Sequence, residues 1–190
     1  MDDLVKAAMA KWPNVPDCYG WLGLDTRGQW WMRDDKAQAA GSFAASFEPS
    51  LASDSERLQS RGALLKHEKL IEFIGRNYAV DARGCWYFQN GPQRVFVELE
   101  YMPWVWRLEH DLRVVTHTGK PVNVEQWLQD PKGRLVGKAE CGWGVLHSQD
   151  MVRFVEALGT ETIDTGVPSE WPPVANYCTS PVALNKNNKV

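Results

Sequence analysis

The sequence predicts an α+β protein with a mainly antiparallel, bent sheet and about three helices, built from a repeated helix plus β-hairpin motif. Residues 78–108 hold three apolar runs that are separated by the turn sequences Asp81–Gly84 and Asn90–Gly91. Both turn sequences favour short β-hairpins, because Asp bonds its own turn and Gly tolerates a positive φ. Residues 94–100 alternate in the period of a strand with one buried face.

Three helices are predicted from apolar residues that recur at spacings of three and four. The first covers residues 4–12 and the second covers residues 65–78. The third covers residues 149–158, with Ser148 as its N-cap and Asp150 in its first turn. A hydroxyl at the N-cap and a carboxylate in the first turn both stabilise the start of a helix.

Strands are predicted on both sides of Asp-x-x-Gly turns, which occur at Asp25–Gly28 and Asp81–Gly84 and in a weaker form at Asp130–Gly133. The order helix, strand, turn, strand therefore occurs twice, at residues 4–32 and 65–88, as expected of an internal repeat. The alternative is that such turns, which are common in β-rich chains, recur by chance. Further strands are predicted over residues 112–116, 122–128, 134–138 and 141–147.

The chain is expected to divide into two repeats and a tail. Residues 1–62 form the smaller, N-terminal repeat and include a mobile insertion over residues 36–62, which is rich in Ala and Ser. Residues 63–160 form the larger α+β repeat. Residues 161–190, which contain several prolines, are expected to be extended and partly disordered.

Composition limits the classes of partner. The net charge of −3 and the pI near 5.8 argue against a nucleic-acid binder. The chain has no long uncharged apolar run and no basic, then apolar, N-terminal segment, so neither a membrane span nor a signal peptide is predicted. A cytoplasmic location is expected. The four cysteines show no Cys-x-x-Cys spacing, so free thiols are predicted, and neither a metal nor a cofactor is indicated.

Tryptophan is the most unusual component, with 10 residues in the chain. Trp104, Trp106 and Trp143 are the candidate ligand-binding residues, because indoles on one concave side of a sheet can stack on a ligand. The alternative is that alternating Trp residues on strands pack under a helix as part of the core.

Only a weak catalytic candidate exists, formed by Cys141, His147 and Asp150 as nucleophile, base and orienting carboxylate. The alternative is a buried strand that leads into a helix whose dipole Asp150 complements. His110 and His117 flank one predicted strand, but no spacing supplies the three or four converging ligands that a metal site needs.

Three phrases carry a family resemblance: KWPNVPDCYGWLGLD, HEKLIEFIGRNYAVDARGCWYFQNGPQRVFVELE and PWVWRL. They resemble an uncharacterised proteobacterial family that is known only as a domain of unknown function. A looser resemblance, in layout, is to a second bacterial family of unknown function, with the matching segments at residues 81–86, 95–104 and 142–158. That resemblance implies an α+β fold with repeated motifs and a suggested role in signalling. It transfers no functional residue.

The function predicted from these observations is a non-catalytic ligand-binding or regulatory module with a small-molecule or protein partner. One alternative is a small thiol-dependent hydrolase or transferase that uses Cys141, His147 and Asp150. Another is a structural homo-oligomer whose surplus Trp residues fill a subunit interface.

Overall fold

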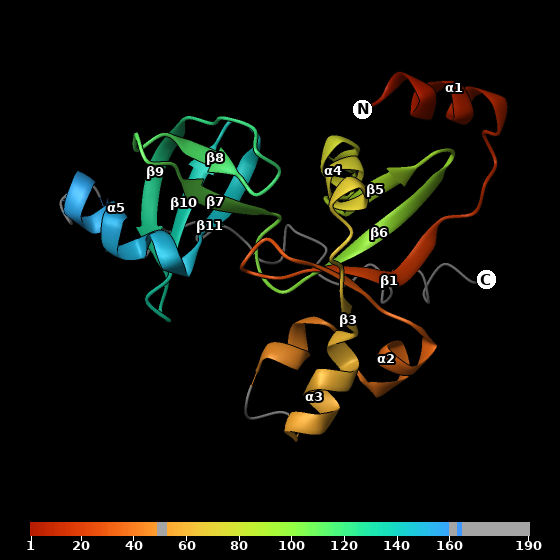
Figure 1. The fold of residues 1–190 in the computed structure, drawn as a ribbon, viewed down its shortest axis with the longest axis horizontal. Coiled ribbons are helices and arrows are strands. Elements are labelled where there is room, and N and C mark those ends of the chain that lie inside the picture. Colours follow the sequence, from red (N-terminus) through yellow and green to blue (C-terminus); the bar gives the residue numbers. More distant parts are fainter. Residues whose placement is uncertain (49–52, 160–162, 165–190) are drawn as a thin grey trace. The chain divides into compact units, whose positions relative to one another are not determined.

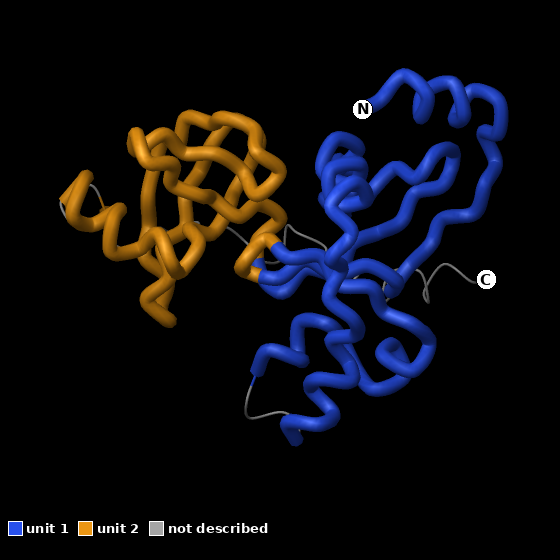
Figure 2. The backbone as a smooth tube through the Cα atoms, viewed as in Figure 1, with its two compact units in different colours: residues 1–25, 29–101, 175–190 blue, residues 26–28, 102–174 orange. Residues whose placement is uncertain are grey.

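The computed structural model describes residues 1–48, 53–159 and 163–164. These residues belong to two compact units (Figure 2). Unit 1 contains residues 1–25 and 29–101, and unit 2 contains residues 26–28, 102–159 and 163–164. Each unit combines a mixed sheet with helices (Figure 1), which confirms the predicted α+β class.

Unit 1 is built on a six-stranded sheet in the order β3-β2-β1-β6-β5-β4. Neighbouring strands are antiparallel except for β1 and β6, which pair in parallel. Residues on both sides of position 62 therefore share one sheet. The strands are β1 (Cys18–Leu24), β2 (Trp30–Met32), β3 (Ala63–Leu64), β4 (Tyr78–Val80), β5 (Trp86–Asn90) and β6 (Gln93–Leu99).

Unit 1 contains more helices than the sequence predicts, because three short helices lie within residues 35–61, in and next to the segment that is expected to be a mobile insertion. Within its described residues, that segment contains α2 (Asp35–Ala40), η1 (Ala44–Phe47) and α3 (Asp54–Arg61). Buried Arg33 holds α2 and α3 by donating to the carbonyls of Ala37 and Ser60. The predicted helices are present as α1 (Asp3–Lys11) and α4 (Glu68–Arg76).

Unit 2 has its own six-stranded sheet, in the order β12-β9-β10-β11-β7-β8. The pairs β7–β11 and β9–β12 are parallel and the other pairs are antiparallel. The strands are β7 (Trp104–Leu108), β8 (Val114–Thr116), β9 (Val124–Gln129), β10 (Leu135–Ala139), β11 (Gly142–Leu146) and β12 (Ile163–Asp164). The rest of the tail predicted over residues 161–190 lies outside the described residues.

The last helix of unit 2 packs on its sheet, as the sequence predicts. After η2 (Ser148–Asp150), α5 (Met151–Leu158) places Phe154, which is fully buried, edge-on to Trp127 of β9, with the ring centroids 4.6 Å apart. The cap differs from the expectation, because the His147 side chain, rather than Ser148, accepts the Gln149 N–H at the start of η2. None of the helices in the described residues has the length and hydropathy that a bilayer-spanning segment requires.

The two sheets share one strand order. In unit 1 the relevant strands are β1, β2, β4, β5 and β6, and in unit 2 they are β7 to β11. Numbered from first to fifth along the chain, both sets lie in the order second, first, fifth, fourth, third. In both sets the first and fifth strands pair in parallel. This correspondence differs from the predicted helix-plus-hairpin repeat, whose two copies both draw on elements of unit 1.

The Asp-x-x-Gly turns have nearly identical geometry. The Oδ1 atoms of Asp25, Asp81 and Asp130 each accept the N–H of the residue four positions on, at 2.8, 2.9 and 2.8 Å. The glycine in each turn has a positive φ, which is +79° at both Gly84 and Gly133. Aspartate satisfies the turn's N–H groups and glycine relieves its strain, which explains why this pairing of residues forms a hairpin.

A fourth turn of this kind joins β7 to β8, with leucine at the glycine position. The Glu109 N–H donates to the carbonyl of Arg113, and the Leu112 N–H donates to the carbonyl of Glu109. Leu112 has φ +67°, a conformation that a side chain with a Cβ disfavours, and it is 45% exposed.

Replacing Leu112 with glycine is expected to raise the free energy of unfolding by about 1 kcal/mol, because the left-handed strain is lost and little burial is given up. The matched control is Gly133→Leu, which places leucine at φ +79° where the nearest heavy atom to a Cβ is 3.9 Å away. It should lower stability by about 1–2 kcal/mol. Chemical denaturation measures both, and a loss of stability in Leu112→Gly would contradict the assignment of strain.

Candidate functional site

The predicted tryptophans lie on two neighbouring strands of unit 2, and two of them belong to its core. Trp104 is 5% exposed and Trp106 is 0% exposed. Their Nε1–H groups donate to the carbonyls of Cys141 and Gly137, at 2.9 and 3.1 Å. Trp143 is partly exposed, and the Lys138 ammonium lies 6.0 Å from its ring centroid. The sheet thus brings Trp104 and Trp106 together, but as packed side chains.

The three residues of the thiol hypothesis do not meet in one place. Cys141 precedes β11 and His147 follows it, so the length of a five-residue strand separates them. At roughly 3.3 Å per residue this separation is about 20 Å. Cys141 is an exposed free thiol, and burial of part of its side chain raises its pKa. A thiol with a raised pKa holds less of the reactive thiolate at neutral pH.

Asp150 has a different role from the one the sequence suggests. Its Oδ2 accepts hydrogen bonds from the Arg107 Nε–H at 2.7 Å and from the Leu108 N–H at 3.1 Å. Burial raises the pKa of the Asp150 carboxyl, but the hydrogen bonds from Arg107 and Leu108 outweigh burial, so the pKa lies below its usual range. The carboxylate therefore stays ionised at neutral pH and orients Arg107.

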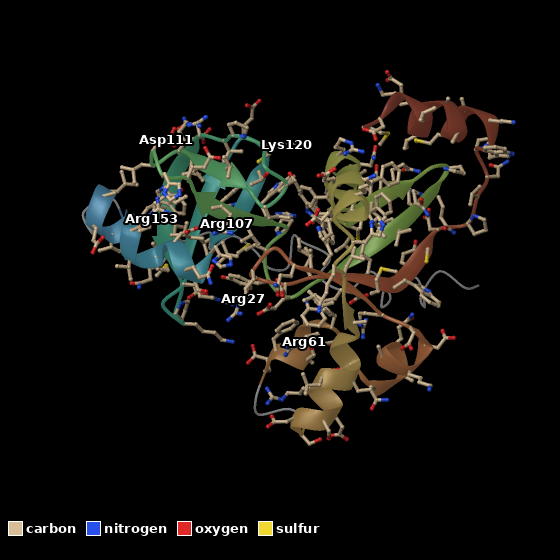
Figure 3. All side chains as sticks on the ribbon, in the orientation of Figure 1. Arg27, Arg61, Arg107, Asp111, Lys120 and Arg153 are labelled. Atoms are coloured by element: carbon tan, nitrogen blue, oxygen red, sulfur yellow. The ribbon has the colours of Figure 1, made fainter. Side chains whose placement is uncertain are left out.

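A second guanidinium lies beside this pair. Arg153, on α5, places Nη1 3.9 Å from the other carboxylate oxygen of Asp150. Its Nη1 and Nη2 donate to the carbonyls of Leu108 and Glu109, at 3.1 and 2.7 Å. Arg107 and Arg153 thus come from a strand and a helix (Figure 3). Both pair with the one buried carboxylate of Asp150. Two guanidinium charges against one carboxylate leave one positive charge.

These residues line an open hollow of about 650 Å³ in unit 2, which we call the arginine pocket. Within the described residues, the two terminal amino groups of Arg107 make no hydrogen bond, since its Nε alone binds Asp150. The pocket volume falls in the range of ligand sites in proteins, roughly 300–1,000 Å³. The lining residues are Arg107, Leu108, Glu109, His110, Asp111, Arg113 and Arg153.

The rim of the arginine pocket carries both signs of charge. Arg113 pairs with Asp111 at 2.6 Å and with Glu109 at 2.9 Å. These three side chains are 63%, 55% and 45% exposed, whereas the Asp150 side chain is 5% exposed. Solvent and salt screen the exposed rim charges far more than the buried carboxylate. The Arg107 and Arg153 side chains, 43% and 38% exposed, are screened much like the rim charges, so the pocket presents arginine donors beside nearby carboxylates rather than a net positive charge.

The DUF2944 family, described as "Protein of unknown function (DUF2946)", matches residues 1–187. The chain belongs to this family. This confirms the resemblance to a family of unknown function that the three sequence phrases carry. No curated protein matches this DUF2944 chain.

Two solved structures are similar to this DUF2944 chain. One is a DUF1285 family protein from Silicibacter pomeroyi DSS-3, with a TM-score of 0.45 and 12% identity, covering 75% of this chain and 72% of that protein. The other is a DUF1285 family protein from Shewanella baltica OS155, with a TM-score of 0.40 and 16% identity, covering 72% of this chain and 91% of that protein.

The arginine pocket is the feature that sequence reasoning missed. Arg107 and Arg153 are 46 positions apart, and each stands alone in a stretch that was interpreted only for its strand or helix period. Asp150 was noticed, but its partner was sought in the nearby His147 rather than on β7. The available signal was Asp150 at a predicted helix start with Arg153 three residues on; its burial and its pairing with Arg107 are visible only in the structure.

Proposed function

We propose that the chain is a non-catalytic binding module whose arginine pocket holds the anionic group, a carboxylate or a phosphate, of a small-molecule ligand or partner protein. The observation that carries the proposal is the Arg107–Asp150–Arg153 cluster, in which one buried carboxylate holds two guanidiniums at an open hollow. Guanidinium forks bind carboxylates and phosphates through paired, charge-assisted hydrogen bonds.

Pre-organisation supports the same function. The Arg107 Nε–H is already bound to Asp150, and two backbone carbonyls hold Arg153. Their orientation is therefore set before a ligand arrives, which reduces the entropy that binding must overcome. The separation of Cys141 and His147 along β11 supports binding rather than thiol chemistry in unit 2.

Replacing Arg107 with glutamine is expected to weaken binding of inorganic phosphate and acetate by roughly 10- to 100-fold, because a charge-assisted pair of hydrogen bonds is lost. Isothermal titration calorimetry on the full chain, at constant ionic strength, measures this change. Asp111→Asn should strengthen binding several-fold, since it removes a carboxylate that competes for Arg113.

The matched control is Arg134→Gln. Arg134 also donates Nε–H to an aspartate of its own unit, at 2.6 Å from Asp130, but it does not line the pocket. Its replacement should leave anion affinity unchanged. Equal losses in Arg107→Gln and Arg134→Gln, or no saturable binding of either anion to the unaltered chain, would overturn the proposed function.

A further inference from the structure

We infer that the ligand of the arginine pocket is a carboxylate attached to an apolar chain, and that this chain lies in a second hollow beside the pocket. The inference rests on the proposed function and adds the chemical class of the ligand. Its basis is that the arginine pocket and an apolar hollow of the same unit share Arg113 in their linings.

The second hollow, which we call the apolar pocket, has a volume of about 500 Å³. Arg113 lines both pockets, and Leu112 of the apolar pocket follows Asp111 of the arginine pocket in the β7–β8 turn. Helix α5 also reaches both, through Arg153 and Leu158. The apolar side chains that line the apolar pocket are mainly those of Leu112, Val114, Val122, Val124, Trp127 and Leu158.

Two of these side chains leave much of their apolar surface uncovered. Leu112 is 45% exposed and Leu158 is 41% exposed. An exposed apolar surface that is contiguous with polar groups is typical of a ligand or partner site. Each methylene that covered such a surface would strengthen binding by up to about fourfold.

The conformation of Leu112 points to the same surface. Its φ of +67° is one that glycine adopts without strain, and the equivalent positions of the other turns are glycines. Residues with a strained backbone are concentrated at binding sites, where contacts with the surrounding structure compensate for the cost of the strain. Here the leucine supplies the apolar wall nearest to the arginines.

The arginine side chains favour an apolar ligand that carries a negatively charged group. Arg113 lines the apolar pocket and also the arginine pocket, which Arg107 and Arg153 line as well. A neutral hydrocarbon would leave the terminal amino groups of Arg107 without a partner, whereas a carboxylate at the end of the chain pairs with them bidentately. An unbranched carboxylic acid therefore fits both pockets at once.

The test is a titration of the full chain with acetate, butanoate, hexanoate and octanoate at constant ionic strength. Affinity is expected to rise by about two- to fourfold per methylene as the chain covers the apolar pocket. Leu112→Asn, which keeps a residue that tolerates the left-handed conformation, and Leu158→Ser should reduce this rise per methylene. The matched control is Val152→Ser, an exposed apolar position of α5 that does not line the pocket.

The outcomes separate the two proposals. Acetate binding that does not strengthen with chain length would overturn the inference and leave the proposed function standing, whereas no binding of any acid would overturn both. Octanoate binding that is unchanged in Arg107→Gln would also overturn the inference, since the carboxylate would then not be held. A short peptide that ends in leucine can be tested as the free acid and as the C-terminal amide. Tighter binding of the free acid would show that the C-terminus of a polypeptide can also supply the carboxylate and the apolar side chain.

Discussion

Replacing Trp106 with alanine is expected to lower the free energy of unfolding by about 3–5 kcal/mol, the range for large aromatic side chains in a core. Trp106 is fully buried, and its indole N–H donates to the Gly137 carbonyl. Its ring stacks with that of Trp104, with the centroids 6.4 Å apart and an interplanar angle of 12°. The variant therefore loses a large apolar contact area and leaves a cavity in unit 2.

Gly144 explains how the indole fits against the sheet. A Cβ at this position would lie 2.4 Å from Cε2 of Trp106, closer than atoms can approach. Gly144→Ala alone should cost about 1–3 kcal/mol through overpacking. In the double variant with Trp106→Ala, the added methyl group lies in the space that the indole has left, so the combined cost should be less than the sum.

Denaturant unfolding of the single and double variants measures these costs. Trp12→Ala serves as the control, because Trp12 is 51% exposed and its loss should change stability by less than about 0.5 kcal/mol. Strictly additive costs in the double variant would show that Trp106 and Gly144 do not share a space.

Lowering the pH from 7 to 5 is expected to cost unit 2 about 2 kcal/mol through His117 alone. The residue is partly exposed, but its Nε2 is buried and its Nδ1 accepts the Val105 N–H at 3.3 Å. Burial lowers the pKa of His117 from 6.5 to about 3. Between those values the unfolded chain binds a proton and the folded chain does not, so stability is complete above pH 6.5 and is lost as the pH falls.

The matched variant is His117→Asn, whose side-chain oxygen retains an acceptor for the Val105 N–H and does not titrate. Between pH 7 and pH 5, the loss of unfolding free energy in this variant should be about 2 kcal/mol smaller than the loss in the unaltered chain. The remaining histidines and the carboxylates are common to both proteins, so the difference isolates His117. Equal slopes of unfolding free energy against pH would show that His117 is protonated in the folded chain.

The hairpins of both units are the part of the fold that the sequence predicts best, because their cause is local. Asp81 and Gly84 contain all that the turn needs, namely an acceptor for its N–H groups and a residue for its positive φ. The β7–β8 turn was not recognised as one of the same kind, since Leu112 holds the left-handed position without being glycine. A sequence pattern identifies a glycine that adopts the left-handed conformation without strain, but it does not identify a leucine that adopts the same conformation at a cost.

The segment over residues 36–62 was interpreted as mobile because it lacks an apolar period. In the structure, its described residues form helices that are held by the buried side chains of Phe43 and Ala37 as well as by polar contacts. Ser53 and Glu56 form a capping box at the start of α3, a pattern that was available in the sequence. The buried Arg33 guanidinium, which binds backbone carbonyls in this segment, was not predictable, since nothing local distinguishes it from an exposed arginine.

Only part of the candidate site could be predicted from the sequence. Asp150 was singled out, but its link to Arg107 depends on α5 returning to β7, and no local pattern encodes that return. The parallel pairing of β7 with β11 is equally long-range. Turn residues specify neighbouring antiparallel strands, whereas parallel neighbours need a crossover whose path is decided by packing.

The parallel pairs also determine how each sheet can come apart. In unit 1 the first and last of the five shared strands, β1 and β6, are interior neighbours in the sheet, and β7 and β11 are interior neighbours in unit 2. Chain ends usually fray first, but detaching either of these strands divides the sheet into two parts rather than trimming an edge. In each unit, release of the first or the last of the five shared strands and division of the sheet are therefore a single cooperative event, although the edge strand β12 can detach from unit 2 without dividing its sheet.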